Sequence, residues 1–209
     1  MTVRAGVVDY GMGNLRSVAK ALEAAGAKAT VSDDKKVLEG SDLLVVPGQG
    51  AFGAAAAVIK SRGLASFLKG WLTEDRPFLG ICLGLQILFE GSEEAPGVKG
   101  LGVLPGRVRK FRPRRRSLKV PHMGWNRAEP GPSDGAFSKA LPAGDHFYFV
   151  HSFYADPEDK SSIWTQTEYD GPFCSAVARG NLAATQFHPE KSGDAGLHLL
   201  KNILKEIRR

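Results

Sequence analysis

The stretch Pro77-Phe-Leu-Gly-Ile-Cys82-Leu-Gly-Leu-Gln86-Ile-Leu-Phe89 decides the fold of this chain. Before Cys82 the residues are apolar or glycine behind a proline, which is typical of a short, fully buried strand. From Leu83 to Phe89 the apolar positions recur at helical spacing and predict a helix. Cys82 therefore sits at a strand-to-helix turn inside Gly80-x-Cys82-x-Gly84, the nucleophile-elbow pattern with a thiol in place of the serine hydroxyl.

An elbow of this kind suits a nucleophilic cysteine. A side chain at the tip of a sharp turn is strained, and flanking glycines provide room and unusual torsion angles. Unpaired N–H groups at the start of a helix favour an anion, and so a thiolate, at Cys82. The N–H of Leu83 would be one donor to an oxyanion. The alternative is a small buried cysteine in a glycine-rich turn, and the elbow alone leaves both interpretations open.

Length and composition are those of an ordinary globular protein. The 209 residues are 43% hydrophobic and 24% charged, and they fit one domain spanning residues 1–209. No apolar run approaches the roughly 20 residues that cross a bilayer, and the N-terminus lacks the apolar core of a signal peptide. We therefore expect a cytoplasmic protein with no membrane partner. The two cysteines, Cys82 and Cys174, lie far apart, which argues against a disulfide framework and against a metal site.

Much of the net charge of +6 comes from one basic segment, residues 107–116. Outside it, positive and negative side chains nearly balance. The segment has no recognition-helix pattern, so it is weak support for nucleic-acid binding. We interpret it as the solvated tip of a hairpin and expect no nucleic-acid partner.

Strands and helices alternate through the first half of the chain. Asn14 is placed to cap a helix that Gly26 closes, and two further helices are expected between Gly50 and residue 72, broken near Arg62-Gly63. This alternation predicts a parallel sheet with helices on both faces. The expected strands cover residues 3–8, 27–31, 42–46 and 77–81.

The second half is different in character. Glycine, proline and β-type segments dominate from Gly91 to Gln186, including a strand over 101–111 with a break at Pro105-Gly106. An amphipathic helix over residues 195–207 ends the chain. The fold class is therefore α/β, an open and mostly parallel sheet flanked by helices, with a β-rich second half.

A histidine and a carboxylate follow the predicted strand 182–187, as His188-Pro189-Glu190. Proline ends the strand there, at the carboxyl edge where open α/β sheets place their sites. A spacing of two keeps both side chains on one side, so His188 could take a thiol proton while Glu190 fixes its tautomer. A histidine at a strand end often has only a structural role. Together with the Cys82 elbow, however, this pair favours a catalytic Cys, His and Glu set.

The turn Pro47-Gly48-Gln49-Gly50 follows another buried strand, so its backbone can lie beside Cys82. Glycines would let N–H groups from Gly48, Gln49 and Gly50 turn toward a developing oxyanion, next to the N–H of Leu83. A movable peptide there could switch the oxyanion hole on and off. The alternative is an ordinary strand-to-helix turn.

The Gly80-Ile-Cys82-Leu-Gly84-Leu-Gln86 and Phe187-His188-Pro-Glu190 motifs resemble those of the triad, or class I, glutamine amidotransferases. Within that family, other segments are similar to the glutaminase subunits of imidazole glycerol phosphate synthases. The resemblance extends over essentially the whole chain and implies a flavodoxin-like α/β fold. The further segments are Asp9-Tyr10-Gly11-x-Gly13-Asn14, Pro121-His122-Met123-Gly-Trp125-Asn126, Tyr148-Phe-Val-His151-Ser152 and Phe187-His188-Pro-Glu190-Lys191-Ser192.

The resemblance implies hydrolysis of glutamine to glutamate and ammonia without a cofactor. Cys82 would attack the side-chain amide, His188 would shuttle the proton and Glu190 would orient His188. Substrate contacts are implied for Gln86, for Glu94 at the α-amino group, and for the backbone of Ser152 and Phe153 at the carboxylate.

The resemblance also implies a heterodimer with a separate (β/α)8-barrel cyclase, which uses the ammonia to form imidazole glycerol phosphate in histidine biosynthesis. Ammonia that escapes into water is protonated and stops being a nucleophile, so a closed ammonia channel is expected. Trp125 is interpreted as an interface anchor, with a core tryptophan as the alternative. Lys191 could form an ion pair across the interface. The expected interface residues are Asn14, His122, Met123, Trp125, Asn126, Tyr148 and Lys191.

Two residues depart from the family pattern. Gln49 stands where many relatives have a small or branched apolar residue, and Phe153 replaces a common tyrosine. Two alternative functions also remain open: the glutaminase subunit of another class I synthase, such as an anthranilate or pyridoxal type, and a non-catalytic α/β regulatory module. The complete Cys, His and Glu set argues against the second.

Overall fold

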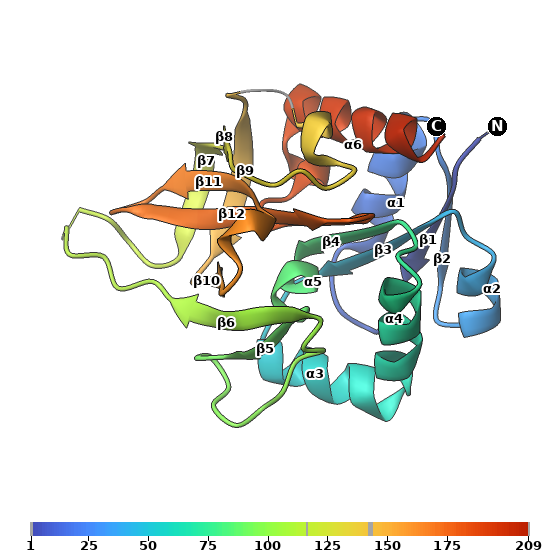
Figure 1. Ribbon diagram of the computed structural model, residues 1–209, viewed down its shortest axis with the longest axis horizontal. Helices are drawn as coiled ribbons and strands as arrows, with labels where there is room; N and C mark the ends of the chain where they lie inside the picture. Colours follow the sequence, from blue (N-terminus) through green and yellow to red (C-terminus); the bar gives the residue numbers. More distant parts are fainter. Residues whose placement is uncertain (1, 116, 142–143, 209) are drawn as a thin grey trace.

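A sheet of eleven strands forms the centre of the computed structural model, which describes residues 2–115, 117–141 and 144–208 (Figure 1). The strands are β1 (Arg4–Val8), β2 (Lys28–Ser32), β3 (Leu43–Gly48), β4 (Phe78–Cys82), β5 (Phe89–Ser92), β6 (Leu104–Lys110), β7 (His122–Arg127), β8 (Glu129–Pro130), β9 (His146–His151), β10 (Phe153–Pro157), β11 (Ile163–Glu168), β12 (Pro172–Arg179) and β13 (Leu182–Thr185). The main sheet has the order β2-β1-β3-β4-β13-β12-β10-β6-β5, with β11 beside β12 and β8 beside β11. The strands β7 and β9 form a separate antiparallel pair.

The helices account for most of the remaining regular structure. Asn14 caps the first of them as expected, because its side chain accepts a hydrogen bond from the N–H of Ser17. The last begins at Gly193, two residues earlier than the sequence predicts. The α-helices are α1 (Leu15–Ala24), α2 (Lys35–Glu39), α3 (Phe52–Ser61), α4 (Leu64–Thr73), α5 (Leu83–Gln86) and α6 (Gly193–Ile207), and short 3-10 turns cover Ser138–Ala140, Lys160–Ser162 and Pro189–Lys191.

The direction of the strands changes halfway across the sheet. From β2 through β1, β3 and β4 to β13, all neighbours are parallel. A hairpin at Gly180 joins β12 to β13, and beyond it the pairs are antiparallel except for β5 with β6. The expected open α/β sheet with a β-rich second half is confirmed.

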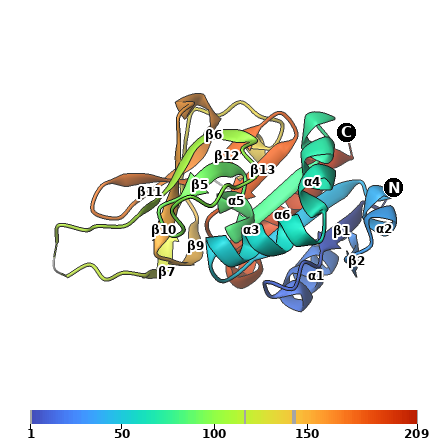
Figure 2. The same ribbon diagram turned by 90° about the horizontal axis from the view of Figure 1, so that it is seen from below.

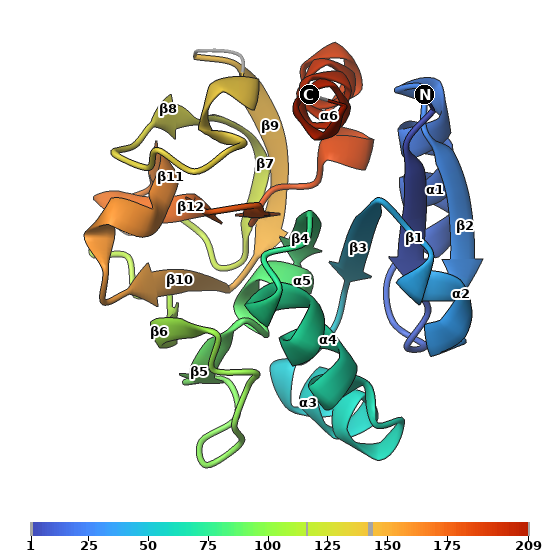
Figure 3. The same ribbon diagram turned by 45° about the vertical axis from the view of Figure 1, so that its right-hand side comes forward.

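Helices cover both faces of the parallel strands, as Figure 3 shows. The helices α1 and α6 bury Leu22, Leu199 and Ile203 in one core, whereas α3 and α4 bury residues such as Phe52 and Leu68 in the other. Alternate residues of β3 point into the two cores, since successive side chains of a strand face opposite sides. No helix among the described residues is long and apolar enough to cross a membrane.

The helix predicted from Leu83 to Phe89 is shorter than expected. It ends after four residues, at Gln86, and Phe89 begins strand β5 instead. The chain pairs with a distant segment instead: the N–H groups of Leu101 and Val103 donate to the carbonyl groups of Ile87 and Leu88, at 2.7 and 2.9 Å, and Phe89 is the register partner of Leu104. The side chains of Ile87, Leu88 and Phe89 are still buried, but Phe89 belongs to β5 and the other two residues precede it.

The basic segment is not a hairpin tip. Arg107, Arg109 and Lys110 lie in β6, which pairs with β5 and β10. The expected break at Pro105-Gly106 is a shift of register against β5 within this strand, where Gly106 has a φ of 119°. Gly106 is required there because a Cβ atom would overlap the carbonyl oxygen of Asp156. The chain beyond β6 then extends away from the body of the molecule in both Figure 1 and Figure 2.

Acidic neighbours match much of the charge of this basic segment. Arg109 lies 3.2 Å from Asp156 and 3.6 Å from Glu93, which also pairs with Arg112 at 2.9 Å. Arg115 lies 3.2 Å from Asp170. Arg116 lies outside the described residues. Three arginines of this segment are therefore paired within the fold, while the net charge of the chain stays at +6.

Candidate active site

Cys82 occupies a strained turn between β4 and α5. Its φ is 54° and its ψ is −103°, a conformation that non-glycine residues rarely adopt and that costs about 1–3 kcal/mol. A Cβ atom on Gly84 would overlap the carbonyl oxygen of Val46, and one on Gly80 would lie 2.7 Å from the carbonyl oxygen of Gly84. The two glycines therefore allow α5 to start directly against β3, and the predicted strand-to-helix turn is confirmed.

His188 follows the strand next to β4. The strands β4 and β13 are parallel neighbours, with Ile81 opposite Thr185, so their carboxyl ends meet at one edge of the sheet. His188 Nδ1 lies 2.8 Å from Glu190 Oε1, and these side chains are 1% and 2% exposed. Since the carboxylate oxygen accepts this hydrogen bond, Nδ1 carries the proton. His188 Nε2 has no hydrogen-bond partner among the described residues and is free to act on a neighbour.

The electrostatics of His188 favour its charged form. Burial alone would lower its pKa, but side-chain interactions with Cys82 and Glu190, and the negative charges of both, raise the pKa of His188 to about 9. An imidazolium flanked by the sulfur and the carboxylate is the protonation state that this geometry supports near neutral pH.

A cavity of about 450 Å³ opens in front of these residues. This volume lies within the range typical of small-molecule sites. Residues from both halves of the chain line the cavity. Three of them, Pro121, Val150 and His151, were not expected in the site from the sequence. The lining consists of Gln49, Gly50, Cys82, Leu83, Gln86, Glu94, Pro121, Tyr148, Val150, His151, Ser152, Phe153, His188 and Lys191.

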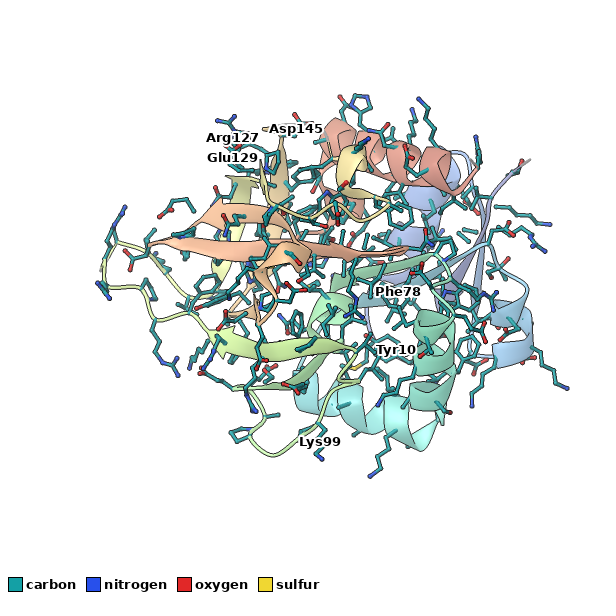
Figure 4. All side chains as sticks on the ribbon, in the orientation of Figure 1. Tyr10, Phe78, Lys99, Arg127, Glu129 and Asp145 are labelled. Atoms are coloured by element: carbon teal, nitrogen blue, oxygen red, sulfur yellow. The ribbon has the colours of Figure 1, made fainter. Side chains whose placement is uncertain are left out.

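The expected oxyanion turn lies directly beside Cys82. Gly48, at the end of β3, is the register partner of Cys82 in β4, and Gly50 has a φ of 111°. A Cβ atom on Gly48 would overlap the hydroxyl of Tyr10, a residue that Figure 4 shows in the molecular interior. That hydroxyl is buried without a hydrogen-bond partner among the described residues, and both burial and the nearby charge of Cys82 raise the pKa of Tyr10. The sequence motif includes Tyr10 but gave no sign that it packs beneath this turn.

Two of the expected substrate residues already have partners in the protein. Gln86 Nε2 donates to the carbonyl oxygen of Phe153 at 3.2 Å and to Gln186 Oε1 at 3.1 Å. Glu94 Oε2 accepts the N–H of Phe52 at 2.8 Å. Oε1 of each side chain makes no hydrogen bond that involves another described residue, so these two atoms are the ones left for a ligand.

Trp125 is not a core tryptophan. Its side chain is 56% exposed, beside the 62% exposed Met123 on the same face of β7. The ring of Trp125 lies 6.2 Å from that of Tyr148, which lines the cavity. Lys191 lines the same cavity. An exposed apolar pair therefore adjoins the cavity wall.

The expectation that His122 lies on a partner surface is wrong. His122 is 4% exposed, and its Nδ1 lies 3.0 Å from Nε2 of the buried His151. Asn126 is half-buried and also turns inward, with its amide nitrogen 3.2 Å from His122 Nε2 and 3.0 Å from the carbonyl oxygen of Glu168. Successive residues of a strand face opposite sides, so only Met123 and Trp125 of this segment point outward.

One residue of the site has no counterpart in the sequence-based expectations. Gln186 is fully buried, and its Nε2 lies 3.4 Å from Cys82 Sγ. Its position directly before Phe187-His188 was the only available signal. Among the described residues, no group of three or more His, Cys, Asp or Glu side chains could hold a metal ion.

Comparisons with known proteins show which family this chain resembles over nearly its whole length. The sequence profile described as glutamine amidotransferase class-I matches residues 6–207. An imidazole glycerol phosphate synthase subunit HisH from Thermus thermophilus is 51% identical over 96% of this chain and 95% of its own. The subunit of the same name from Methanothermobacter thermautotrophicus is 47% identical over 97% of this chain and 98% of its own.

Solved structures share the fold. A crystal structure of a glutamine amidotransferase has a TM-score of 0.76 at 22% identity, over 98% of this chain and 99% of that one. The structure of PurLQS from Thermotoga maritima has a TM-score of 0.77 at 23% identity, with the same coverage.

Proposed function

This chain belongs to the class I glutamine amidotransferase family, and we propose that it is the glutaminase subunit of an imidazole glycerol phosphate synthase. In this role it hydrolyses glutamine to glutamate and ammonia, and the ammonia serves histidine biosynthesis. The observation that carries the proposal is the convergence of Cys82 and His188 on one cavity, with Glu190 bonded to the rear of the histidine ring.

The proposed reaction starts with attack of the Cys82 sulfur on the side-chain carbonyl carbon of glutamine. The oxygen of the tetrahedral intermediate accepts hydrogen bonds from the N–H of Leu83 and from the turn at Gly48, Gln49 and Gly50. His188 Nε2–H gives its proton to the departing ammonia, which leaves a γ-glutamyl thioester. Water then attacks the thioester while His188 takes its proton, and glutamate and the free thiol are released.

The remaining cavity residues would hold the substrate. Oε1 of Gln86 can accept a hydrogen bond from the bound glutamine, and Oε1 of Glu94 can accept one from the α-amino group of that glutamine. Backbone groups of Ser152 and Phe153 are proposed to contact the α-carboxylate. These assignments rest on the position of the residues in the cavity wall and on the atoms that other contacts leave free.

The proposed partner is a separate (β/α)8-barrel cyclase seated over Met123 and Trp125. Exposed tryptophan and methionine are enriched at the centres of protein interfaces. Trp125 also contacts Tyr148, so this surface continues into the cavity wall. Such a seat would let ammonia pass to the cyclase without meeting bulk water, and Lys191 at the rim could pair with an acidic residue of the partner.

We expect the isolated chain to release glutamate slowly and the complex to release it at least about 10²-fold faster. The reason is that a movable oxyanion turn at Gly48–Gly50 can be held in its productive state by the partner, and one oxyanion donor is worth about 10²–10³ in rate. The measurement is a glutamate assay with and without the cyclase and its phosphoribosyl-type ligand. Fast turnover by the chain alone would contradict partner gating, and no turnover in either case would contradict the enzyme assignment.

Replacing Trp125 with alanine is expected to weaken the complex by at least tenfold in Kd, because a buried anchor contributes about 1.4 kcal/mol or more. Titration of the cyclase measures this directly. The matched control is Val37→Ala, which alters an apolar side chain 47% exposed on α2. An unchanged Kd for Trp125→Ala would place the interface elsewhere on the chain.

A further inference from the structure

A continuous series of hydrogen bonds joins the Cys82 sulfur to strand β7. Its side chains are buried apart from the half-buried Asn126 at its end, and we call it the Gln186–Asn126 network. Its bonds are Gln186 Nε2 to Cys82 Sγ (3.4 Å), Gln86 Nε2 to Gln186 Oε1 (3.1 Å), Gln86 Nε2 to Phe153 O (3.2 Å), His151 Nδ1 to Phe153 O (2.7 Å), His122 Nδ1 to His151 Nε2 (3.0 Å) and Asn126 Nδ2 to His122 Nε2 (3.2 Å).

The carbonyl oxygen of Phe153 fixes the direction of the bonds toward Cys82. A carbonyl oxygen only accepts, so Gln86 must direct its NH₂ group at Phe153. The second N–H of that group then donates to Oε1 of Gln186. With its oxygen so engaged, Gln186 directs its own NH₂ group at the Cys82 sulfur.

The same oxygen fixes the tautomers of the two histidines. His151 donates from Nδ1 to the Phe153 carbonyl, so Nε2 of the neutral ring accepts. His122 must donate to it from Nδ1, and its own Nε2 then accepts from Asn126. The second N–H of Asn126 is used by the carbonyl oxygen of Glu168. Every member of the network thus has one permitted orientation.

The surroundings of the histidines keep both rings uncharged. Phe111, Phe149 and Phe173 pack around them with ring centroids 4.8 to 6.2 Å away. Burial lowers the pKa of His122 to about 4 and that of His151 to about 3. Neutral rings are the form that the series of donors and acceptors requires.

We propose that Gln186 is a positioning residue for the nucleophile, and that the Gln186–Asn126 network holds its amide in the orientation that donates to the Cys82 sulfur. This inference rests on the proposed function and deepens it. The amide N–H stabilises negative charge on the sulfur and restricts its rotation, so that the sulfur faces the cavity on one side and His188 on the other. The same network holds Gln86 in the cavity wall.

Gln186 acts through Cys82 and does not touch substrate. It is 0% exposed and lies behind the cavity wall rather than in it. Loss of its N–H should therefore lower the rate of the chemical step and leave glutamine binding nearly unchanged. This separates it from Gln86 and Glu94, whose substitution should raise KM.

The test is Gln186→Glu, which keeps an acceptor for Gln86 but removes the donor to the sulfur, with Gln186→Met as an apolar variant of similar shape. In the activated complex we expect kcat to fall at least about 30-fold while KM for glutamine stays within about threefold. Thr185→Val is the matched control, because Thr185 is equally buried in β13 and its hydroxyl donates to the carbonyl oxygen of Phe187 rather than to the Cys82 sulfur. It should keep kcat within about threefold.

A second readout does not depend on glutaminase activity. The rate at which iodoacetamide alkylates Cys82 at pH 7, followed by peptide mass spectrometry, should fall at least about fivefold in Gln186→Glu and stay near the wild-type rate in Thr185→Val. Unchanged kcat and alkylation in the Gln186 variants would overturn the proposal, as would equal losses in Thr185→Val. If the wild-type complex has no glutaminase activity, the alkylation rates still decide the role of Gln186 while the proposed function fails separately.

Discussion

Replacement of Cys82 by alanine is expected to abolish glutamate release, with a loss in kcat of at least about 10³-fold, because it removes the thiol that forms the proposed covalent intermediate. The sulfur sits at the end of β4 beside the oxyanion turn, and alanine leaves both of these backbone features in place. The measurement is single-turnover glutamate formation in the activated complex.

The second cysteine provides the control for this experiment. Cys174 is also buried, in β12, and its thiol contacts the carbonyl oxygen of Ala176. Cys174→Ala should keep kcat within a few fold, although its stability will be lower. Activity of Cys82→Ala near the wild-type value would remove the nucleophile assignment and leave only the family's fold.

Stability is expected to fall steeply in mild acid, by on the order of 2 kcal/mol between pH 6.5 and pH 5. The pKa values of His122 and His151 lie at about 4 and about 3 in the folded chain, below their ordinary value near 6.5. In this window the unfolded chain binds more protons than the folded one, so stability is lost as pH falls. Tyr169 faces His122 with its ring centroid 4.2 Å away and its plane tilted by 34°. His151 faces His122 and His188, and a positive charge on either disfavours protonation of His151.

His188 acts in the opposite direction. Its folded pKa of about 9 exceeds the unfolded value, so the folded chain binds the extra proton between about pH 6.5 and pH 9 and stability declines as pH rises through that range. The profile should therefore peak between about pH 6.5 and 7.

Denaturant unfolding across the pH range tests both arms of the profile. His122→Phe should flatten the acid arm, and the control His198→Ala, at an exposed position of α6, should leave it unchanged. An acid arm equally steep in His122→Phe and the wild-type chain would mean that carboxylates, not the buried histidines, control acid stability.

The backbone of the site could be predicted from the sequence because glycines indicate the turns and the ends of apolar segments indicate where strands stop. Gly80 and Gly84 marked the turn at Cys82. The strand before His188 was also expected, although β13 ends at Thr185 and not at Phe187. The apolar spacing from Leu83 to Phe89, in contrast, suited a helix and a buried strand equally well. The pairing of loop 101–103 with the carbonyl groups of Ile87 and Leu88 decided between them, and local sequence carries no record of that pairing.

Side-chain direction was harder to predict than position. The segment from His122 to Asn126 was expected to face a partner as a unit, but strand alternation divides it between an exposed face and a buried network. Gln186 escaped notice for a related reason. The role of Gln186 depends on its contacts with Gln86 and Cys82, which lie about a hundred residues earlier in the chain and become its neighbours only in the fold.

The register that sets Gly48 opposite Cys82 has a consequence for how such proteins diverge. The spacing between the attacking atom and the peptides that would receive the charge is built into main-chain pairing, which depends on few side chains beyond the absence of a Cβ atom at Gly48, Gly80 and Gly84. Most side chains outside the turn can therefore change while this pairing of the main chain is kept. Solved structures that share only 22–23% of residues with this chain, with TM-scores of 0.76–0.77, show that the fold persists through that much change.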